Sequence, residues 1–353
     1  MNASSATPAL RNAPSILLGH LTPEVQERVE GFYSNVDAIF ESWINRRKSQ
    51  HTRRAYREDV LAFVRFMGWI WPQGAPELLR CTVHNVLAFR ETLLASGAAP
   101  KTLNRRISSL SGFYKYLAGA VAELRLPINV PNPAHAQFVA REPADPREER
   151  RALTPALARQ LMELPSGTTI LAARDRAILK FFLYSGARLG TACRLKVSDF
   201  HHEGGEAAIR LEEKGNRRRT IGLHHAAAQA ISEYISLASI QSGPLFRPRQ
   251  THSETLANRP MDEVTMWRLT LGYLERLPDS TRLVSQGADG TVRRKCVYTP
   301  HSLRATTATL LLAAGVDICK VQELLGHRHI TTTQLYDKRR RSLSESASYD
   351  IPI

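Results

Sequence analysis

Along the first third of the chain, apolar residues recur every three or four positions, which is the period of an amphipathic helix. This pattern predicts helices, each bounded by Pro, Gly or a Ser/Thr cap, over residues 22–46, 49–69, 82–96 and 100–119. In the last of them, one apolar stripe consists of Leu103, Ile107, Leu110, Phe113 and Leu117. We therefore expect a helical domain over residues 21–133, preceded by a flexible, polar N-terminus at 1–20.

Residues 134–150 combine proline with dense charge and no apolar period, which predicts a linker. A second domain is expected over 151–340, opened by Thr154 as a helix cap and Pro155 at the first helical position. Most of it has helical periodicity, but residues 206–212 and 217–223 predict a β-hairpin around a Lys-Gly-Asn turn. The stretch 279–298 has no clear pattern, and 341–353 forms a short tail. The fold class is thus mainly α with a small β-hairpin or sheet.

The chain has 353 residues and a formal charge of +15, with 48 Lys and Arg against 33 Asp and Glu. Such a surplus attracts a polyanion, so nucleic acid is the favoured partner, although a ribosomal or membrane-surface protein would also fit. Basic residues lie opposite the apolar stripes of two predicted helices, where they can face phosphates or simply form a solvated surface. These DNA-binding candidates are Arg53, Arg54, Arg57, Lys101, Arg105 and Arg106.

Four separated cysteines without a CxxC pair indicate reduced core thiols in a cytosolic protein: Cys81, Cys193, Cys296 and Cys319. We find neither a secretion signal nor a membrane span, so the expected location is the cytoplasm. The histidines lack zinc-site spacing and no GxxxxGK[ST] loop is present. We expect no metal and no cofactor.

The chemistry resides in six separated residues: Arg188, Lys214, His301, Arg304, His327 and Tyr336. His301 and Arg304 are three apart in a predicted helix, so both project from one face. Tyr336 follows His327 by nine residues, on a predicted helix that Thr331 or Thr332 could cap. Two arginines, two histidines, a lysine and a hydroxyl nucleophile suffice for phosphoryl transfer without metal or ATP.

Each of these residue types suits one task in cleaving a DNA phosphodiester. Arg188 and Arg304 can bind the scissile phosphate bidentately, with His327 as a third donor. Tyr336 can attack, leaving a 3′-phosphotyrosine and a free 5′ hydroxyl. His301 can accept or relay the tyrosine proton. Lys214 can protonate the leaving oxygen, but Arg217, Arg218 and Arg219 lie close enough in sequence to do so instead, or to dock phosphate.

Four segments resemble the signature blocks of the tyrosine recombinase (phage integrase, Xer-like) family: YSGARLG, EEKGNRRRTIGL, HSLRATTATLLLAAG and LLGHRHITTTQLY. The resemblance implies the DNA breaking-rejoining enzyme fold, with 21–133 as the DNA-clamping core-binding domain and 151–340 as the catalytic domain. Two positions depart from the family pattern. The residue three after Arg188, usually acidic, is Thr191, which leaves open what orients Arg188; the residue after Arg304 is Ala305 rather than the frequent histidine.

The function expected from this resemblance is site-specific recombination, whether integration, excision, transposition or resolution. Its implied partners are a double-stranded DNA site in the bacterial nucleoid and further copies of the chain, as a dimer on each site and a tetramer in the synapse. Accessory DNA-bending or recombinase proteins could join them, and the tail 341–353 could dock on a neighbouring protomer. A type IB topoisomerase or hairpin-forming resolvase would use the same chemistry, and a regulator that has lost catalysis would bind DNA without cleaving it.

Overall fold

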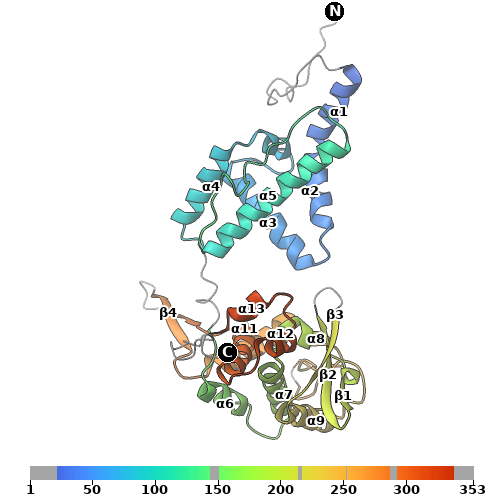
Figure 1. Ribbon diagram of the computed structural model, residues 1–353, viewed down its shortest axis with the longest axis vertical. Coiled ribbons are helices and arrows are strands. Elements are labelled where there is room, and N and C mark those ends of the chain that lie inside the picture. The colour runs from blue at the N-terminus through green and yellow to red at the C-terminus, as the bar shows by residue number, and fades with distance from the viewer. Residues whose placement is uncertain (1–21, 144–150, 214–216, 252, 287–291, 338–353) are drawn as a thin grey trace, which may run out of the picture. The chain divides into compact units, whose positions relative to one another are not determined.

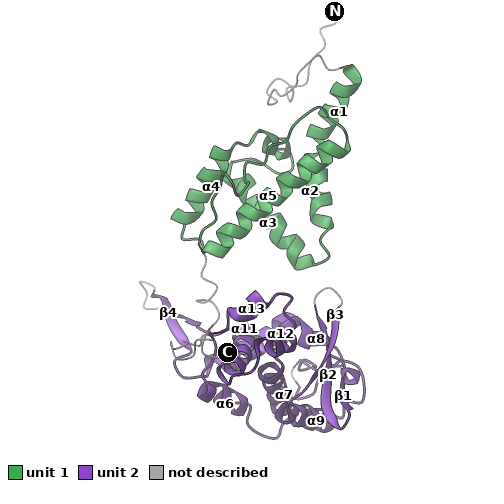
Figure 2. Cartoon of the chain, viewed as in Figure 1, with its two compact units in different colours: residues 1–144 green, residues 145–353 purple. Residues whose placement is uncertain are grey.

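The computed structural model describes residues 22–143, 151–213, 217–251, 253–286 and 292–337. The chain divides into two compact units, residues 1–144 and 145–353, which we describe separately (Figure 1, Figure 2). Both are mainly helical, as the hydrophobic pattern predicts, and the antiparallel strands of the described residues lie in the second unit. The expected N-terminus at 1–20 and tail at 341–353 fall outside the described residues.

The first unit consists of helices α1 (Pro23–Ser34), α2 (Val36–Asn45), α3 (Gln50–Phe66), η1 (Ala75–Arg80), α4 (Val83–Ala95) and α5 (Pro100–Glu123). The helix predicted over 22–46 is two helices, because the backbone leaves the helical region at Asn35, which ends α1 and begins α2. The other three predicted helices are confirmed to within a few residues.

The core of the first unit forms around the predicted stripe of α5. All five stripe residues are fully buried, and Phe113 packs edge-on against Phe40 of α2. This core extends beyond residue 133, since Ala134 and Val139 are completely buried in it. The side chain of Asn104 also exchanges two hydrogen bonds with the backbone of Glu142. Residues 134–142, which the sequence places in the linker, therefore pack on the first unit.

The helices of the second unit are α6 (Pro155–Glu163), α7 (Ile170–Ser185), α8 (Leu189–Arg194), η2 (Val197–Asp199), α9 (His225–Leu237), α10 (Glu263–Glu275), α11 (Pro300–Ala313), α12 (Ile318–Leu325) and α13 (Ile330–Gln334). Helix α7 is apolar on most sides, and it packs against α6, α9 and α11. Because such a helix must be covered all round, α7 forms the centre of this unit.

Two small antiparallel sheets complete the second unit. One has the order β1 (Phe200–Glu203), β2 (Glu206–Glu213), β3 (Arg217–Gly222); the other pairs β4 (Thr281–Gln286) with β5 (Val292–Cys296). The predicted hairpin at 206–223 is confirmed, with β1 as an additional strand, and the unreadable stretch 279–298 holds the second pair. Ile209 faces Ile221 across the hairpin and Glu213 faces Arg217, so the register carries apolar residues into the core.

Three of the four cysteines are buried, as expected, but Cys319 is exposed because it lies on the solvent side near the start of α12. None of the helices in the described ranges combines the length and apolar character needed to cross a membrane.

Candidate active site

The end of α7 brings the first arginine to the site. The chain leaves α7 through Gly186, whose φ of +57° is in the left-handed region that favours glycine. A Cβ at this position would lie 2.5 Å from a methyl carbon of Leu325, so a larger residue here would force that side chain to shift. Arg188 then stands at the N-cap of α8, with its side chain 41% exposed.

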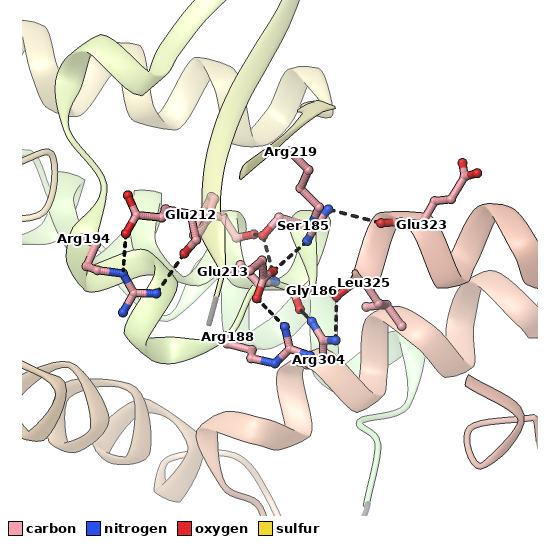
Figure 3. A network of polar contacts seen from close by, with 12 residues as sticks. Ser185, Gly186, Arg188, Arg194, Glu212, Glu213, Arg219, Arg304, Glu323 and Leu325 are labelled. Carbon is pink, nitrogen blue, oxygen red and sulfur yellow. Dashed lines mark hydrogen bonds and ion pairs between the residues drawn. The ribbon is translucent and has the colours of Figure 1, made fainter. Parts of the chain in front are cut away.

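The second arginine, Arg304, is buried within α11 and is only 2% exposed. Its guanidinium donates to the carbonyl oxygens of Gly186 and Leu325, at 2.6 Å each (Figure 3). Burial lowers the pKa of Arg304 to about 10; Arg188 also lowers it, while Tyr336 opposes the shift. Arg304 therefore stays cationic at neutral pH, and its electrostatic neighbours include both Arg188 and the tyrosine.

An acidic residue that sequence analysis missed joins this cluster. Glu213, at the end of β2, is buried and pairs through one carboxylate oxygen with Arg188. Its other oxygen accepts a hydrogen bond of 3.1 Å from Arg219 of β3 (Figure 3). A signal was present in the sequence, because Glu213 ends an alternating strand directly before the basic turn and would need a cationic partner if buried.

Arg219, named from sequence as a DNA contact, is largely enclosed by protein. Besides its bond to Glu213, it donates to the carbonyl oxygen of Glu323 at 3.3 Å, and burial lowers its pKa. Gly326 lies against it: a Cβ there would be 2.8 Å from the Arg219 Nε atom. Arg219 thus supports the arginine cluster from within the protein, whereas Arg218 is exposed. Lys214 and the side chain of Arg217 lie outside the described residues.

The tyrosine lies close to both histidines. The hydroxyl oxygen of Tyr336 lies 3.4 Å from His301 Nε2, and its ring is parallel to that of His327, with centroids 6.0 Å apart. His327 Nδ1 is 2.9 Å from the Thr333 hydroxyl. Tyr336 is 2% exposed and packs with Ala308, among the residues that join α11 to α12.

The helix expected to carry the tyrosine differs from the prediction. Helix α13 ends at Gln334, so Tyr336 lies just beyond it, and its N-cap is His329 rather than Thr331 or Thr332. The threonine of this helix that contacts the candidate site is Thr333, whose hydroxyl lies against His327 inside the protein.

The structure thus gathers Arg188, His301, Arg304, His327 and Tyr336 from four separate segments around the ends of α7, α11 and α12. Within the described residues, no group of three or more His, Cys, Asp or Glu side chains is arranged to hold a metal ion.

Several basic residues that sequence analysis assigned to DNA contact in the first unit are engaged inside that unit. Arg57 forms a two-pronged ion pair with Glu41, one prong of which measures 2.6 Å. Arg105 pairs with the buried Asp59 at 2.6 Å. Arg53 donates to the carbonyl oxygen of Arg47 at 2.6 Å, and Arg106 is partly buried with an enclosed Nε. The exposed members of the set are Arg54, Lys101 and Arg105, although Arg105 is held by its pair with Asp59.

Each of the two units matches a known protein family. The phage integrase family matches residues 151–342, and the N-terminal SAM-like domain of phage integrases matches residues 41–120. The tyrosine recombinase XerC of Xanthomonas campestris pv. campestris (strain B100) is 30% identical over 297 residues, which cover 83% of this chain and 80% of the relative. The XerC of Roseiflexus castenholzii is 29% identical over 321 residues and 88% of each chain.

Solved structures share the fold at lower identity. A lambda integrase dimer bound to a COC′ core site has a TM-score of 0.62 at 19% identity, covering 88% of this chain and 96% of that one. The XerH recombinase in a post-cleavage complex with a palindromic difH substrate also has a TM-score of 0.62, at 16% identity, covering 86% of this chain and 80% of the other. The chain belongs to the phage integrase family and is a tyrosine-type site-specific DNA recombinase.

Proposed function

We propose that Tyr336 is the nucleophile that breaks and rejoins DNA in this recombinase. Its phenolic oxygen attacks the scissile phosphorus, the bond to the 5′ oxygen breaks, and a 3′-phosphotyrosine forms beside a free 5′ hydroxyl. Attack by a 5′ hydroxyl of another strand then reverses these steps and releases the tyrosine. Because the phosphotyrosine retains the energy of the original bond, rejoining requires no ATP. The observation that carries the proposal is the contact between Tyr336 and His301 beside the arginine cluster.

The two arginines bind the non-bridging oxygens of the scissile phosphate in this proposal. A guanidinium has five N–H donors. Arg304 uses one on each terminal nitrogen for the carbonyl oxygens of Gly186 and Leu325, which fixes its plane and leaves further donors for a phosphate. Arg188 is held on one side by Glu213 and is partly exposed on the other. Fixed donors of this kind stabilise developing charge without reorganising during the reaction.

Proton transfer falls to His301, His327 and Lys214. His301 Nε2 is placed to accept the Tyr336 proton. If the Thr333 hydroxyl donates to His327 Nδ1, the other ring nitrogen carries a proton and can donate to the phosphate. Lys214, next along the chain from Glu213, protonates the leaving 5′ oxygen.

The partners in this proposal are a double-stranded DNA recombination site and further copies of the chain, arranged as a dimer on each site and a tetramer in the synapse. Solved relatives include a lambda integrase tetramer bound to a Holliday junction. Among the proposed DNA contacts, Arg54, Lys101 and Arg218 are exposed and can reach phosphates, whereas the equally exposed Arg105 is paired with Asp59. The net charge of +15 suits this role. The reaction takes place on the bacterial nucleoid, with accessory DNA-bending proteins where the site requires them.

Denaturing electrophoresis tests this proposal. The chain is incubated with a duplex that carries its target site and a nick beside the scissile phosphate. Cleavage then releases a short strand with a 5′ hydroxyl, and its diffusion away prevents rejoining and traps the covalent intermediate. We expect a protein–DNA adduct from the natural chain and none from Tyr336→Phe, which should bind the same duplex equally well in a gel-shift assay. Binding without adduct from the natural chain would instead support a regulator that has lost catalysis.

A further inference from the structure

Glu213 occupies a position that the roles assigned so far do not explain. It is 7% exposed, yet it is an ionisable side chain surrounded by cations. Each of its two oxygens takes a different guanidinium: Arg188, which stands at the N-cap of α8, and Arg219, which lies across the hairpin on β3 (Figure 3). One carboxylate therefore ties the hairpin to the loop that follows α7.

The charges around this carboxylate explain why it is needed. Arg188 and Arg219 both act to lower the pKa of the buried Arg304, so the three guanidiniums repel one another, whereas Glu213 acts in the opposite direction. Without an anion among them, the arginine with the most mobile side chain would turn away from the other two. That residue is Arg188, whose side chain is 41% exposed, compared with 19% for Arg219.

Helix α8 itself offers no acid to Arg188 at the position where one would reach it. The residue three after an N-cap faces back toward the N-cap side chain. In α8 this residue is Thr191, which is neutral, short and 2% exposed. The orientation of Arg188, which the sequence leaves open, is thus supplied by a strand and not by its own helix.

We infer that Glu213 is a positioning residue for cleavage, which holds Arg188 with its free N–H groups directed at the scissile phosphate and keeps the end of β2 in register with that arginine. The inference rests on the proposed role of Arg188. Glu213 touches neither DNA nor the reacting atoms in this account, and acts through Arg188.

The test is a double-mutant cycle on single-turnover cleavage of the nicked duplex, with protein in saturating excess. Glu213→Gln keeps the shape of the side chain, but its amide group can accept from only one of the two arginines. Misplacing one preorganised donor costs roughly 10- to 100-fold in rate, and we expect a loss of that size with DNA affinity unchanged. In the Arg188→Ala background, Glu213→Gln should cause no further loss, because the residue through which it acts is gone.

Glu212→Gln is the matched control. Glu212 precedes Glu213 on β2, its side chain is 45% exposed, and its ion pair with Arg194 spans 4.0 Å. The Glu212→Gln variant should cleave at the same rate as the natural chain. Thermal melting shows whether Glu213→Gln folds; if it does not, Glu213→Asp, which keeps the charge but shortens its reach, replaces it in the cycle with a smaller expected loss.

The inference would be overturned by unchanged cleavage in the Glu213 variant, or by an equal loss with and without Arg188, which would indicate a general structural role. Faster cleavage with tighter binding would also overturn it, since Glu213 would then compete with the phosphate for Arg188. If the natural chain forms no adduct, the proposed function fails instead, so the two failures are distinguishable.

Discussion

The hydroxyl oxygen of Tyr336 lies 3.4 Å from His301 Nε2, although the two residues are 35 positions apart in the sequence. His301 is exposed on the first turn of α11, whereas Tyr336 is buried against the same helix. The histidine thus stands between the tyrosine hydroxyl and solvent, where it can take the phenolic proton.

Replacing His301 with alanine should therefore slow cleavage with little effect on folding. General base catalysis contributes about 10²- to 10⁴-fold, so we expect a loss in that range in single-turnover adduct formation. The melting temperature should not change because His301 is exposed. A natural cleavage rate in this variant would remove His301 from the proton path.

Thr333→Val should disturb His327 while preserving the shape of the core. The variant loses the hydroxyl that lies 2.9 Å from His327 Nδ1 and leaves that nitrogen without its partner, at a cost of about 1–3 kcal/mol in the free energy of unfolding. With that hydrogen bond to the ring lost, we expect roughly tenfold slower cleavage, since one donor to the phosphate is weakened. Thr331→Val, at an exposed position of the same helix, is the control and should match the natural chain in both assays.

Gly326→Ala should harm catalysis more than its conformational cost explains. Gly326 has a φ of +63°, and an added Cβ would meet Arg219 Nε at 2.8 Å. Gly315→Ala provides the control, because Gly315 has a φ of +80° and a Cβ there meets nothing within 4 Å. Both variants should lose about 1–2 kcal/mol of stability from left-handed backbone. Only Gly326→Ala should also slow adduct formation, and equal cleavage rates in the two variants would contradict the supporting role of Arg219.

Lys214→Ala should slow cleavage of normal DNA but spare a substrate whose 5′ bridging oxygen is replaced by sulfur. A thiolate leaves without needing a proton, so a general acid gives it no advantage. The comparison is the ratio of the two cleavage rates in the natural and variant chains. Equal loss on both substrates would assign Lys214 to phosphate binding, and a corresponding effect from Arg218→Ala alone would transfer the acid role to that residue.

In the first unit, Asp59 should make stability depend on pH. Its carboxylate is 1% exposed and accepts hydrogen bonds from Ser109 and Arg105 at 2.7 and 2.6 Å. Burial raises the pKa of Asp59 above its ordinary value of 3.8, outweighing those bonds. The folded chain therefore binds this proton more readily than the unfolded chain, so the contribution of Asp59 to stability rises as the pH falls through the raised pKa toward 3.8.

Comparison with the Asp59→Asn variant isolates this pH-dependent contribution of Asp59 to stability. As the pH is lowered from 7, the natural chain should gain stability relative to the variant. Tryptophan fluorescence in denaturant can follow this unit, because three of the four tryptophans, Trp43, Trp69 and Trp71, lie in it. If the natural chain gains no stability relative to the variant over this range, the hydrogen bonds offset burial; if it loses stability, they outweigh burial.

Local features of the sequence determined much of the secondary structure of this protein. The helical period predicted α3, α4 and α5, and the alternation around a Lys-Gly-Asn turn predicted the β2–β3 hairpin, because side chains at regular spacing must share one buried face. The three-residue spacing of His301 and Arg304 predicted that both lie on one helix face, since a helix fixes what lies three positions away. The nine residues from His327 to Tyr336 indicated the proposed nucleophile. The split of α1 from α2 at Asn35 was not visible in that periodicity, which continues across the break.

Only the tertiary structure decided which partners those groups have. Glu213 is 25 residues from Arg188, so nothing in the local pattern links them; they meet because β2 packs beside α8 in the folded unit. In the same way, Arg57 and Arg105 look like free cations in a helical projection, yet each pairs with an acid on another helix. Periodicity reports which face of an element is buried, whereas ion pairs and hydrogen bonds depend on how distant elements pack, and that is where the orientation of the arginines is set.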